Sequence, residues 1–236
     1  MKELNARFTQ QVKRTPTVAS FRFVLDEKMG FSPGQFLEMV FDLNDRQNRA
    51  LNKYLSFSSS PENPYIEVTK RLSNSLFSEK LKQLKVNDSV TIKAPLGNCV
   101  LDEKIPRIGF IAGGIGITPV ISMVEYIVSR KLKIDVDLFY SNRNEEEIAF
   151  KEELDAWQAE NNNLKVYYTV TECKPKDGTC YYGQINGDFL MKNACDIKEK
   201  DLFVFGPPAM VEAMYRLLLE LGCNKESIKT EKFIGY

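Results

Sequence analysis

The stretch from Ile108 to Met123 places the strongest constraint on what this chain can fold into. An apolar run with strand character ends at the glycine-rich Gly113–Gly116 (GGIG), and an apolar run with helical character begins at Thr118-Pro119. Glycines allow tight turns and close approach of a ligand to the backbone, and the N–H groups at a helix start favour an anion. We therefore predict a phosphate-binding turn, with Thr118 as the helix N-cap and Pro119 at the first helical position.

Two simpler interpretations compete with a phosphate site. The turn can serve packing alone, because the order Gly-Gly-x-Gly differs from the usual dinucleotide fingerprint. The run Ile108–Val128 is also apolar enough to resemble a membrane span. Because Gly113–Gly116, Pro119 and Glu125 interrupt this run, we do not expect a span.

Histidine is absent from the chain, and this bounds its chemistry. Without imidazole there is no Ser-His hydrolase and no His-ligated metal site. The five cysteines are scattered and contain no Cys-x-x-Cys pair, which argues against a disulfide framework, a zinc site or an iron–sulfur cluster, so no metal is expected. The chemistry must come from a bound cofactor or from other side chains.

The overall composition is that of an ordinary globular protein with one large or two small domains. The 236 residues include 32 Lys+Arg and 32 Asp+Glu, so no basic excess points to nucleic acid. Residues 1–100 carry 15 basic and 10 acidic residues, against 17 and 22 in residues 101–236. The basic half suits an anionic cofactor or an acidic partner, although chance also explains so small an offset. The chain begins without a charged-then-apolar signal peptide, so we expect a cytoplasmic protein.

Residues 1–102 have the pattern of a β domain. Gly, Pro, Asn and Asp separate short runs rich in β-branched and aromatic residues, at Val18–Leu25, Gln35–Phe41, Tyr65–Thr69 and Ser89–Lys93. This spacing predicts an antiparallel barrel or sandwich. One helix is predicted among the strands, because apolar residues recur at helical spacing from Leu76 to Leu84, behind Ser75 as a cap.

Residues 103–236 follow a different period. Strands are predicted at Ile108–Ala112, Ile134–Tyr140, Leu164–Val170 and Leu202–Phe205, and they alternate with helices predicted at Pro119–Arg130, Glu145–Ala159 and Pro207–Leu221. Such alternation predicts a doubly wound parallel α/β sheet. Ligands bind beyond the carboxyl ends of the strands in these sheets. The segments that follow three of the strands should therefore line one crevice: Gly113–Gly116, Ser141–Arg143 and Gly206–Pro208.

Two segments of the first half have the chemistry of a cofactor site. Lys53–Pro61 combines a cation, aromatic rings and hydroxyls at a strand end. A flavin needs an apolar wall for its ring, a hydrogen-bonding partner near N5 and a cation for its diphosphate. Ser75–Ser78 forms a second helix start suited to an anion. The simpler alternatives are a strand with a serine turn, and ordinary N-capping.

These motifs, in this order, resemble the ferredoxin–NADP reductase superfamily of two-domain FAD and NAD(P)H oxidoreductases. The resemblance covers nearly the whole chain. In the first half it runs through Pro33–Phe36 (P-G-Q-F), Lys53–Ser56 (R-x-Y-S), Ser75–Ser78 (G-x-x-S/T), Val86–Asp88 (V-G-D) and Ala94–Gly97 (G-P-x-G). In the second half it runs through Ala112–Pro119 (A-G-G-x-G-x-x-P), Phe205–Met210 (C-G-P-x-x-M) and Glu231–Phe233 (E-x-F).

The resemblance implies a role for each matching residue. Lys53 would contact the FAD diphosphate, Leu55 would lie against the flavin ring with Tyr54 beside it, and Ser56 would hydrogen-bond near flavin N5. The other residues implied to bind FAD are Val68, Thr69, Lys70, Ser75, Phe77 and Ser78. Those implied to bind the nicotinamide dinucleotide are Gly113, Gly114, Gly116, Thr118, Asn142, Arg143, Gly206, Pro207 and Met210. The implied catalytic residues are Ser56 and Glu231, the latter to steer or relay a proton.

Four residues depart from the pattern of the family. Lys53 replaces an arginine, which keeps the charge but loses the bidentate fork. Leu55 replaces the ring-stacking tyrosine, and Ser75 replaces a glycine. Phe205 replaces the cysteine of C-G-P, which in the family usually lies near the reacting carbon.

The implied function is that of an FAD-dependent oxidoreductase. It would pass a hydride from NADH or NADPH to FAD, and then electrons to an acceptor such as ferredoxin, flavodoxin or another redox protein. One alternative, suggested by Lys53 and Leu55, is a flavin reductase that uses flavin as a substrate. Another, suggested by Phe205, is a non-catalytic nucleotide-binding subunit of a redox complex. Arg143 suits the 2′-phosphate of NADPH, but exposed arginines are common, so the choice of nucleotide stays open.

Overall fold

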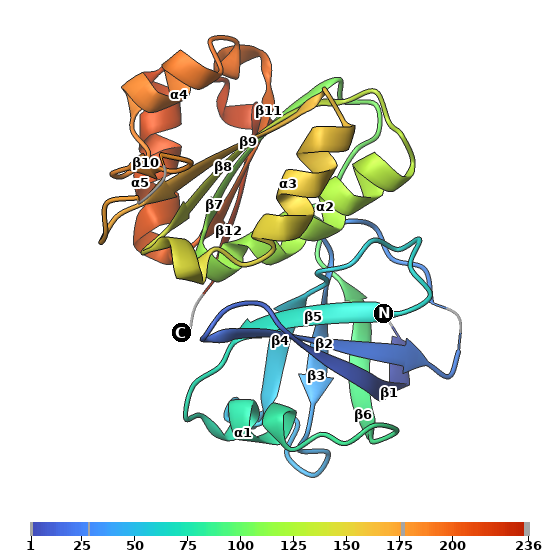
Figure 1. The fold of residues 1–236 in the computed structure, drawn as a ribbon. Coiled ribbons are helices and arrows are strands. Elements are labelled where there is room, and N and C mark those ends of the chain that lie inside the picture. Colours follow the sequence, from blue (N-terminus) through green and yellow to red (C-terminus); the bar gives the residue numbers. More distant parts are fainter. Residues whose placement is uncertain (1, 28, 176–177, 234–236) are drawn as a thin grey trace. The chain divides into compact units, whose positions relative to one another are not determined.

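The computed structural model describes residues 2–27, 29–175 and 178–233. Contacts between residues divide the chain into two compact units (Figure 1). We call the first the barrel unit, which contains Met1–Leu101 and Thr118–Ser129. We call the second the sheet unit, which contains Asp102–Ile117 and Arg130–Tyr236. Among the described residues, no helix is both long and apolar enough to cross a membrane.

The barrel unit is built around a six-stranded antiparallel sheet. Its strands are β1 (Lys2–Lys13), β2 (Val18–Leu25), β3 (Phe36–Val40), β4 (Asn52–Ser56), β5 (Ile66–Arg71) and β6 (Ser89–Leu96). They follow the order β4-β3-β6-β1-β2-β5, and each pairing is antiparallel. A bridge between Phe57 and Val68 joins the two edges, so the sheet closes into a near-barrel. The predicted antiparallel barrel is confirmed.

Strand alternation fills the interior of this barrel. In β1 the buried residues Leu4, Ala6 and Phe8 alternate with exposed ones. The ring of Phe8 packs edge-on against that of Phe23, with centroids 5.6 Å apart. The predicted helix is present as α1 (Leu76–Lys82), and it contributes Phe77 to the same core.

A serine-rich segment anchors helix α2 (Ile117–Ser129) within the barrel unit. The Glu125 carboxylate accepts hydrogen bonds from the backbone N–H of Ser60 at 2.6 Å and from Nδ2 of Asn63 at 2.9 Å. The hydroxyl of Ser122 donates to the carbonyl oxygen of Ser59 at 2.8 Å. Hydrogen bonds to a carboxylate are charge-assisted and stronger than neutral ones. The serines after β4 therefore position a helix, a role that the sequence did not reveal.

The sheet unit contains a six-stranded sheet in which every pairing is parallel. Its strands are β7 (Arg107–Gly113), β8 (Asp135–Asn142), β9 (Leu164–Val170), β10 (Tyr181–Tyr182), β11 (Asp201–Gly206) and β12 (Ile228–Lys232). The order is β10-β9-β8-β7-β11-β12. Because the chain builds outward from β7 first to one side and then to the other, the sheet is doubly wound, as predicted.

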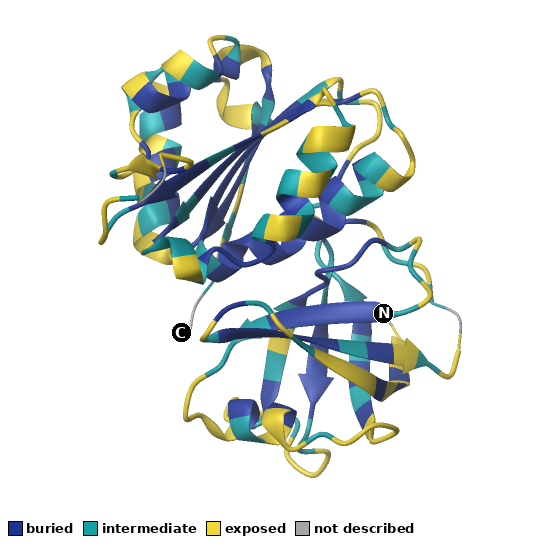
Figure 2. Ribbon diagram, in the orientation of Figure 1, coloured by how far each residue is buried: buried dark blue, intermediate teal, exposed yellow. Residues whose placement is uncertain are grey.

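Helices cover both faces of this sheet. On one face lie α4 (Gly187–Asn193) and α5 (Pro208–Glu220), whose residues Phe189 and Leu218 join Phe139 in a buried cluster. On the other face lies α3 (Lys151–Glu160), where the Tyr168 hydroxyl donates to Asp155 Oδ1 at 2.7 Å. The central strands are buried along nearly their whole length (Figure 2), as expected for a parallel sheet covered on both faces.

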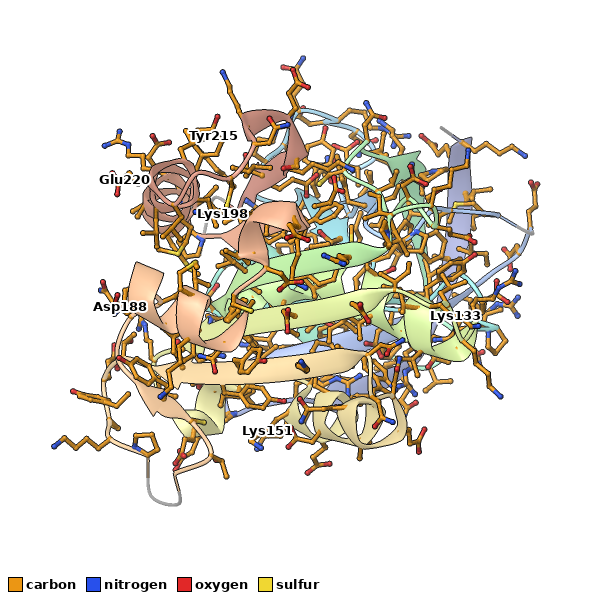
Figure 3. All side chains as sticks on the ribbon, turned by 90° about the horizontal axis from the view of Figure 1, so that it is seen from above. Lys133, Lys151, Asp188, Lys198, Tyr215 and Glu220 are labelled. Carbon is orange, nitrogen blue, oxygen red and sulfur yellow. The ribbon has the colours of Figure 1, made fainter. Side chains whose placement is uncertain are left out.

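The helix predicted over Glu145–Ala159 is wrong in its first part. A short 3-10 turn spans Glu145–Glu147, and α3 begins only at Lys151, which is labelled in Figure 3. Phe150 has φ 61, in the left-handed region, and this conformation separates the two segments. A bulky residue rarely adopts positive φ, so the local sequence contains no signal for this break.

Candidate functional site

Strand β4 carries the segment predicted to bind a flavin. Its register pairs Leu55 with Leu37 and Ser56 with Phe36. Alternation places Lys53 and Leu55 on one face of the strand and Tyr54 and Ser56 on the other. The first two are half-buried, Ser56 is buried and Tyr54 is exposed.

Tyr54 has its contacts on its own face of β4. Its ring lies edge-on to that of Phe36, with centroids 5.8 Å apart, and the guanidinium of Arg49 lies 5.3 Å from its centroid. The structure thus places this ring on the face opposite Leu55. The apolar surface on the Leu55 face comes from Leu55 itself and from the barrel core against which it packs.

Two lysines from neighbouring parts of the barrel lie close together. Lys70, on β5, is half-buried, and burial lowers the pKa of its ammonium group, with a further lowering from the positive charge of Lys53. Within the described part of the chain, neither lysine forms an ion pair with a carboxylate. Two cations held together in partial burial favour an anion between them. The pair therefore has the chemistry required for the diphosphate of a dinucleotide cofactor.

The residues before Lys70 serve the barrel itself. Val68 is completely buried. The hydroxyl of Thr69 lies 2.6 Å from that of Ser20 and 2.7 Å from that of Ser58, so it belongs to a chain of buried hydroxyl groups. Because this hydrogen bonding occupies the Thr69 side chain, Val68 and Thr69 shape the wall of the site, and the charged contact falls to Lys70.

The start of α1 is capped as predicted. Ser75 is the N-cap, and its hydroxyl accepts a hydrogen bond from the backbone N–H of Ser78 at 3.3 Å. The Phe77 ring is completely buried and packs edge-on to Phe41, with centroids 5.2 Å apart. Phe77 can therefore reach a phosphate only through its backbone, while its side chain stabilises the barrel.

In the sheet unit, the glycine turn continues β7 directly into helical structure. After Gly113 the chain forms a 3-10 turn at Gly114–Gly116, and α2 follows at Ile117 without a break. Thr118 is consequently the second residue of α2, and the prediction that it is the N-cap is wrong. The reason is that the glycines themselves adopt the first helical turn, with Gly113 in extended conformation at its N-cap position.

Gly116 is required in this turn because the backbone at the end of β11 approaches it closely, and Gly113 leaves room for the side chain of Met210. A Cβ on Gly116 would lie 2.5 Å from the carbonyl oxygen of Phe205, and one on Gly113 would overlap Sδ of Met210. A Cβ on Gly206 would lie 3.3 Å from the backbone nitrogen of Gly113. The turn is thus held against the end of β11 by its lack of side chains, which leaves its amide groups at the strand ends.

Three strand ends meet at this point, as the sequence predicted. Gly113 pairs with Ser141 at the end of β8, and Ala112 pairs with Phe205 at the end of β11. Pro207 follows as the N-cap residue of α5, and Met210 lies within its first turn. The chain leaves β7 for β8 on one side and reaches β11 on the other, so Gly113 stands at the topological switch point where such sheets bind ligands.

The end of β8 carries a buried side chain whose hydrogen-bonding groups are unused. Asn142 is 5% exposed, and neither its amide nitrogen nor its amide oxygen has a hydrogen-bond partner among the described residues. Buried amides are almost always satisfied in proteins, so an orphaned amide beside the glycine turn suits a polar ligand. The next residue, Arg143, is exposed and forms an ion pair with Glu172 at 3.6 Å.

Phe205 and Glu231 lie side by side in the sheet. They are paired in register on β11 and β12. The Phe205 ring is completely buried, and its centroid lies 6.1 Å from that of Phe203. Glu231 is half-buried, and burial raises the pKa of its carboxyl group to about 7. A carboxyl group with such a pKa exchanges a proton near neutral pH.

The residues present in each unit fit a dinucleotide cofactor. In the barrel unit, the Lys53 and Lys70 cations have no carboxylate partner among the described residues and lie beside a strand with an apolar face and a buried hydroxyl. In the sheet unit, a glycine turn that a Cβ would block lies beside an orphaned amide at the switch point. Together these features define a two-domain oxidoreductase that uses FAD and a nicotinamide dinucleotide.

Comparison with known proteins agrees with this class. Residues 5–101 match the family model of the oxidoreductase FAD-binding domain, and residues 110–216 match that of the oxidoreductase NAD-binding domain. The chain belongs to the ferredoxin–NADP reductase superfamily, and it is an FAD-dependent oxidoreductase that passes a hydride from NAD(P)H to FAD and electrons to a redox acceptor.

Among its relatives is NADH-cytochrome b5 reductase 1 of Aspergillus oryzae. That protein is 30% identical over 223 residues, which are 88% of this chain and 75% of the relative. The cytochrome b5 reductase domain of Ulva prolifera nitrate reductase shares the fold, with a TM-score of 0.83, 23% identity and coverage of 98% of this chain and 97% of that chain. Ferredoxin-NADP+ reductase from Plasmodium falciparum, solved with 2′P-AMP, has a TM-score of 0.81 at 19% identity, covering 98% of this chain and 96% of that chain.

Proposed function

We propose that this chain oxidises a reduced nicotinamide dinucleotide and delivers electrons to a small redox protein of the kind that cytochrome b5 represents. The observation that carries the proposal is the presence on one chain of both the Lys53 and Lys70 cations and the Gly113–Gly116 turn at the switch point of a parallel sheet. The similarity to NADH-cytochrome b5 reductase 1 supports this class of acceptor.

When bound, FAD takes up a hydride from reduced nicotinamide and releases electrons to an acceptor. In the barrel unit, the ammonium groups of Lys53 and Lys70 neutralise the cofactor diphosphate. Leu55 offers an apolar surface to the ring, and the hydroxyl of Ser56 hydrogen-bonds at the ring edge. These residues bind and orient the cofactor, so none of them requires an imidazole.

In the sheet unit, the backbone N–H groups of the Gly114–Gly116 turn hold the diphosphate of the nicotinamide dinucleotide. The Asn142 amide hydrogen-bonds to a ribose, which satisfies its buried polar atoms. Glu231 holds a proton on its carboxyl group below neutral pH and releases it above, because burial raises its pKa to about 7. It is therefore the residue of this unit suited to proton exchange with solvent during turnover.

A stopped-flow experiment on the purified protein tests the proposal. After gel filtration the protein should retain FAD, and mixing with NADH or NADPH should bleach the flavin spectrum. Oxidised cytochrome b5 should then restore that spectrum. A protein that stays colourless after incubation with FAD would refute the proposal, and loss of FAD on the column would favour a flavin reductase.

The role of Ser56 is tested by a matched pair of substitutions. Ser56→Ala should slow flavin reduction about tenfold, the effect of one hydrogen bond lost from a transition state. Ser89→Ala removes a hydroxyl from an exposed position at the start of β6 and should leave the rate unchanged. Equal rates in the two variants would remove Ser56 from the site.

A further inference from the structure

The hydroxyl group of a buried tyrosine holds the first carbonyl group of the glycine turn. Tyr140, on β8, donates a hydrogen bond from its hydroxyl to the carbonyl oxygen of Gly114 at 3.2 Å. Its side chain is completely buried. β8 is the neighbour of β7, and Tyr140 is in register with Ala112, two residues before Gly114. The phenol therefore reaches from a covered face of the sheet to the point where β7 passes into the 3-10 turn.

Gly114 has a backbone conformation that needs support from outside the turn. Its φ of 52 lies in the left-handed region, and a Cβ there would meet nothing within 4 Å. The residue is therefore a glycine for its backbone and not for lack of space. The N–H group of Ile117, which closes the turn, is shared between the carbonyl groups of Gly114 and Ile115. Because a shared N–H cannot point straight at both acceptors, the phenol supplies the Gly114 carbonyl with a second donor.

The direction of this carbonyl group decides which end of a peptide dipole faces an anion at the turn. The peptide bond after Gly114 is trans, so its C=O and N–H groups point in opposite directions. While the phenol holds the carbonyl oxygen, the positive end of this peptide is directed away from the buried side chain. A rotated peptide would present its carbonyl oxygen to the anion and repel it. Glycine with open space around it can make this rotation easily.

We propose that Tyr140 is a positioning residue of the nucleotide site. Its hydroxyl fixes the Gly114 peptide in the orientation that accepts the diphosphate of the nicotinamide dinucleotide. This inference rests on the proposed function. Tyr140 acts through the Gly114 carbonyl group, so it requires no contact with the ligand. Its hydroxyl therefore contributes to binding of the nucleotide and not to hydride transfer.

Tyr168 provides a matched control on the neighbouring strand. It is in register with Tyr140, and the two rings lie with their centroids 6.4 Å apart. Tyr168 is also buried, but its hydroxyl donates to Oδ1 of Asp155 in α3 at 2.7 Å. Replacement of either tyrosine by phenylalanine keeps the ring and removes one hydrogen-bonded hydroxyl. Because the bond of Tyr168 is made to a carboxylate, Tyr168→Phe should lower stability at least as much as Tyr140→Phe.

Calorimetric titration of the FAD-loaded proteins with NAD+ tests the inference, together with urea denaturation. In Tyr140→Phe the affinity for NAD+ should fall about three- to tenfold, the effect of one hydrogen bond. In Tyr168→Phe it should stay within about 1.5-fold of the wild-type affinity, although stability falls. The larger loss of affinity and the larger loss of stability thus belong to different variants.

Stopped-flow reduction of the flavin over a series of NADH concentrations separates binding from chemistry. The apparent dissociation constant for NADH should rise in Tyr140→Phe by the same factor as that for NAD+. The limiting rate at saturating NADH should stay within about twofold of the wild-type rate, because an interaction lost equally from the ground state and the transition state leaves the limiting rate unchanged.

Several results would overturn the inference. NAD+ affinity in Tyr140→Phe within about 1.5-fold of wild type would show that the hydroxyl does not position the turn. Equal losses of affinity in both variants, or a Tyr140→Phe protein that fails to fold, would assign the hydroxyl to general stability. A lower limiting rate with unchanged binding would assign it to the chemistry. In each case the wild-type protein still binds NAD+ and the proposed function stands, whereas a wild-type protein that does not bind NAD+ would overturn both.

Discussion

Replacing Gly116 by alanine should weaken nucleotide binding while leaving the barrel unit intact. The new Cβ would lie 2.5 Å from the carbonyl oxygen of Phe205, 2.7 Å from its carbonyl carbon and 2.8 Å from Cα of Gly206. All three atoms belong to the backbone, so no rotamer change relieves the overlap, and the turn and the end of β11 must separate. Overpacking of this kind costs about 1–3 kcal/mol. If the empty turn relieves this strain by moving away from β11, binding of a nucleotide must restore the strained geometry, and the affinity falls about 5- to 150-fold.

The assay is calorimetric titration of NAD+ into the purified variant, with the ratio of flavin to protein absorbance as a measure of FAD content. Affinity for NAD+ should fall within that range, and FAD content should match that of the wild-type protein. Gly30→Ala is the matched control, because a Cβ there meets nothing within 4 Å and its φ lies outside the left-handed region. A twofold change in affinity corresponds to only about 0.4 kcal/mol, less than the expected strain. The reasoning would be refuted if Gly116→Ala bound NAD+ within about twofold of the wild-type affinity.

Three further predictions concern charge. Glu67→Gln removes a buried carboxylate shared by two guanidinium groups and should lower the free energy of unfolding by about 3–5 kcal/mol. The control Asp26→Asn, in an exposed ion pair, should change that free energy by less than about 1 kcal/mol. Urea denaturation measures both effects. Lys70→Met should weaken FAD retention about tenfold in gel filtration, since one of two phosphate cations is lost. Glu231 has a pKa of about 7 in the folded protein against its ordinary 4.5, so the folded state binds the proton more tightly than the unfolded state. Stability is therefore lost as the pH rises from about 4.5 to about 7. The loss is at most about 1.4 kcal/mol per pH unit. Glu231→Gln should flatten this part of the stability profile.

Much of the fold followed from residue periodicity. β2 and β9 have the predicted bounds. Turn residues delimit each strand, and the order of polar and apolar residues along each strand follows its pattern of exposed and buried positions. The antiparallel and parallel halves could be told apart from the sequence. A strand of the antiparallel sheet is exposed on one face, so polar residues occur at alternate positions. A strand of the parallel sheet is covered by helices on both faces, so its residues are apolar throughout. Short elements were missed, including α4 and β12, since the periodic signal of a short amphipathic segment is weak.

Other features could not be predicted because they depend on the folded chain and not on local sequence. Phe150 adopts positive φ in a buried position, and nothing in its neighbours predicts that conformation. The proximity of Lys53 to Lys70 joins β4 to β5, and the pairing of Arg143 with Glu172 joins the ends of β8 and β9. Each becomes visible only when strand order and register are known. Glu172 stands two residues after the predicted strand Leu164–Val170, and its position in the sequence does not indicate its partner.

Phe205 contributes its backbone to the glycine turn, while its ring belongs to the core of the sheet unit. The carbonyl oxygen of Phe205 lies 2.5 Å from where a Cβ of Gly116 would be, and any residue supplies a carbonyl. Its ring packs beside that of Phe203 and is completely buried. At Gly206 a Cβ would make a tight contact, 3.3 Å from the backbone nitrogen of Gly113. Gly116 therefore fixes the turn, while the position of Phe205, in register with Ala112 and Glu231, admits any side chain that the neighbouring aromatic cluster can bury.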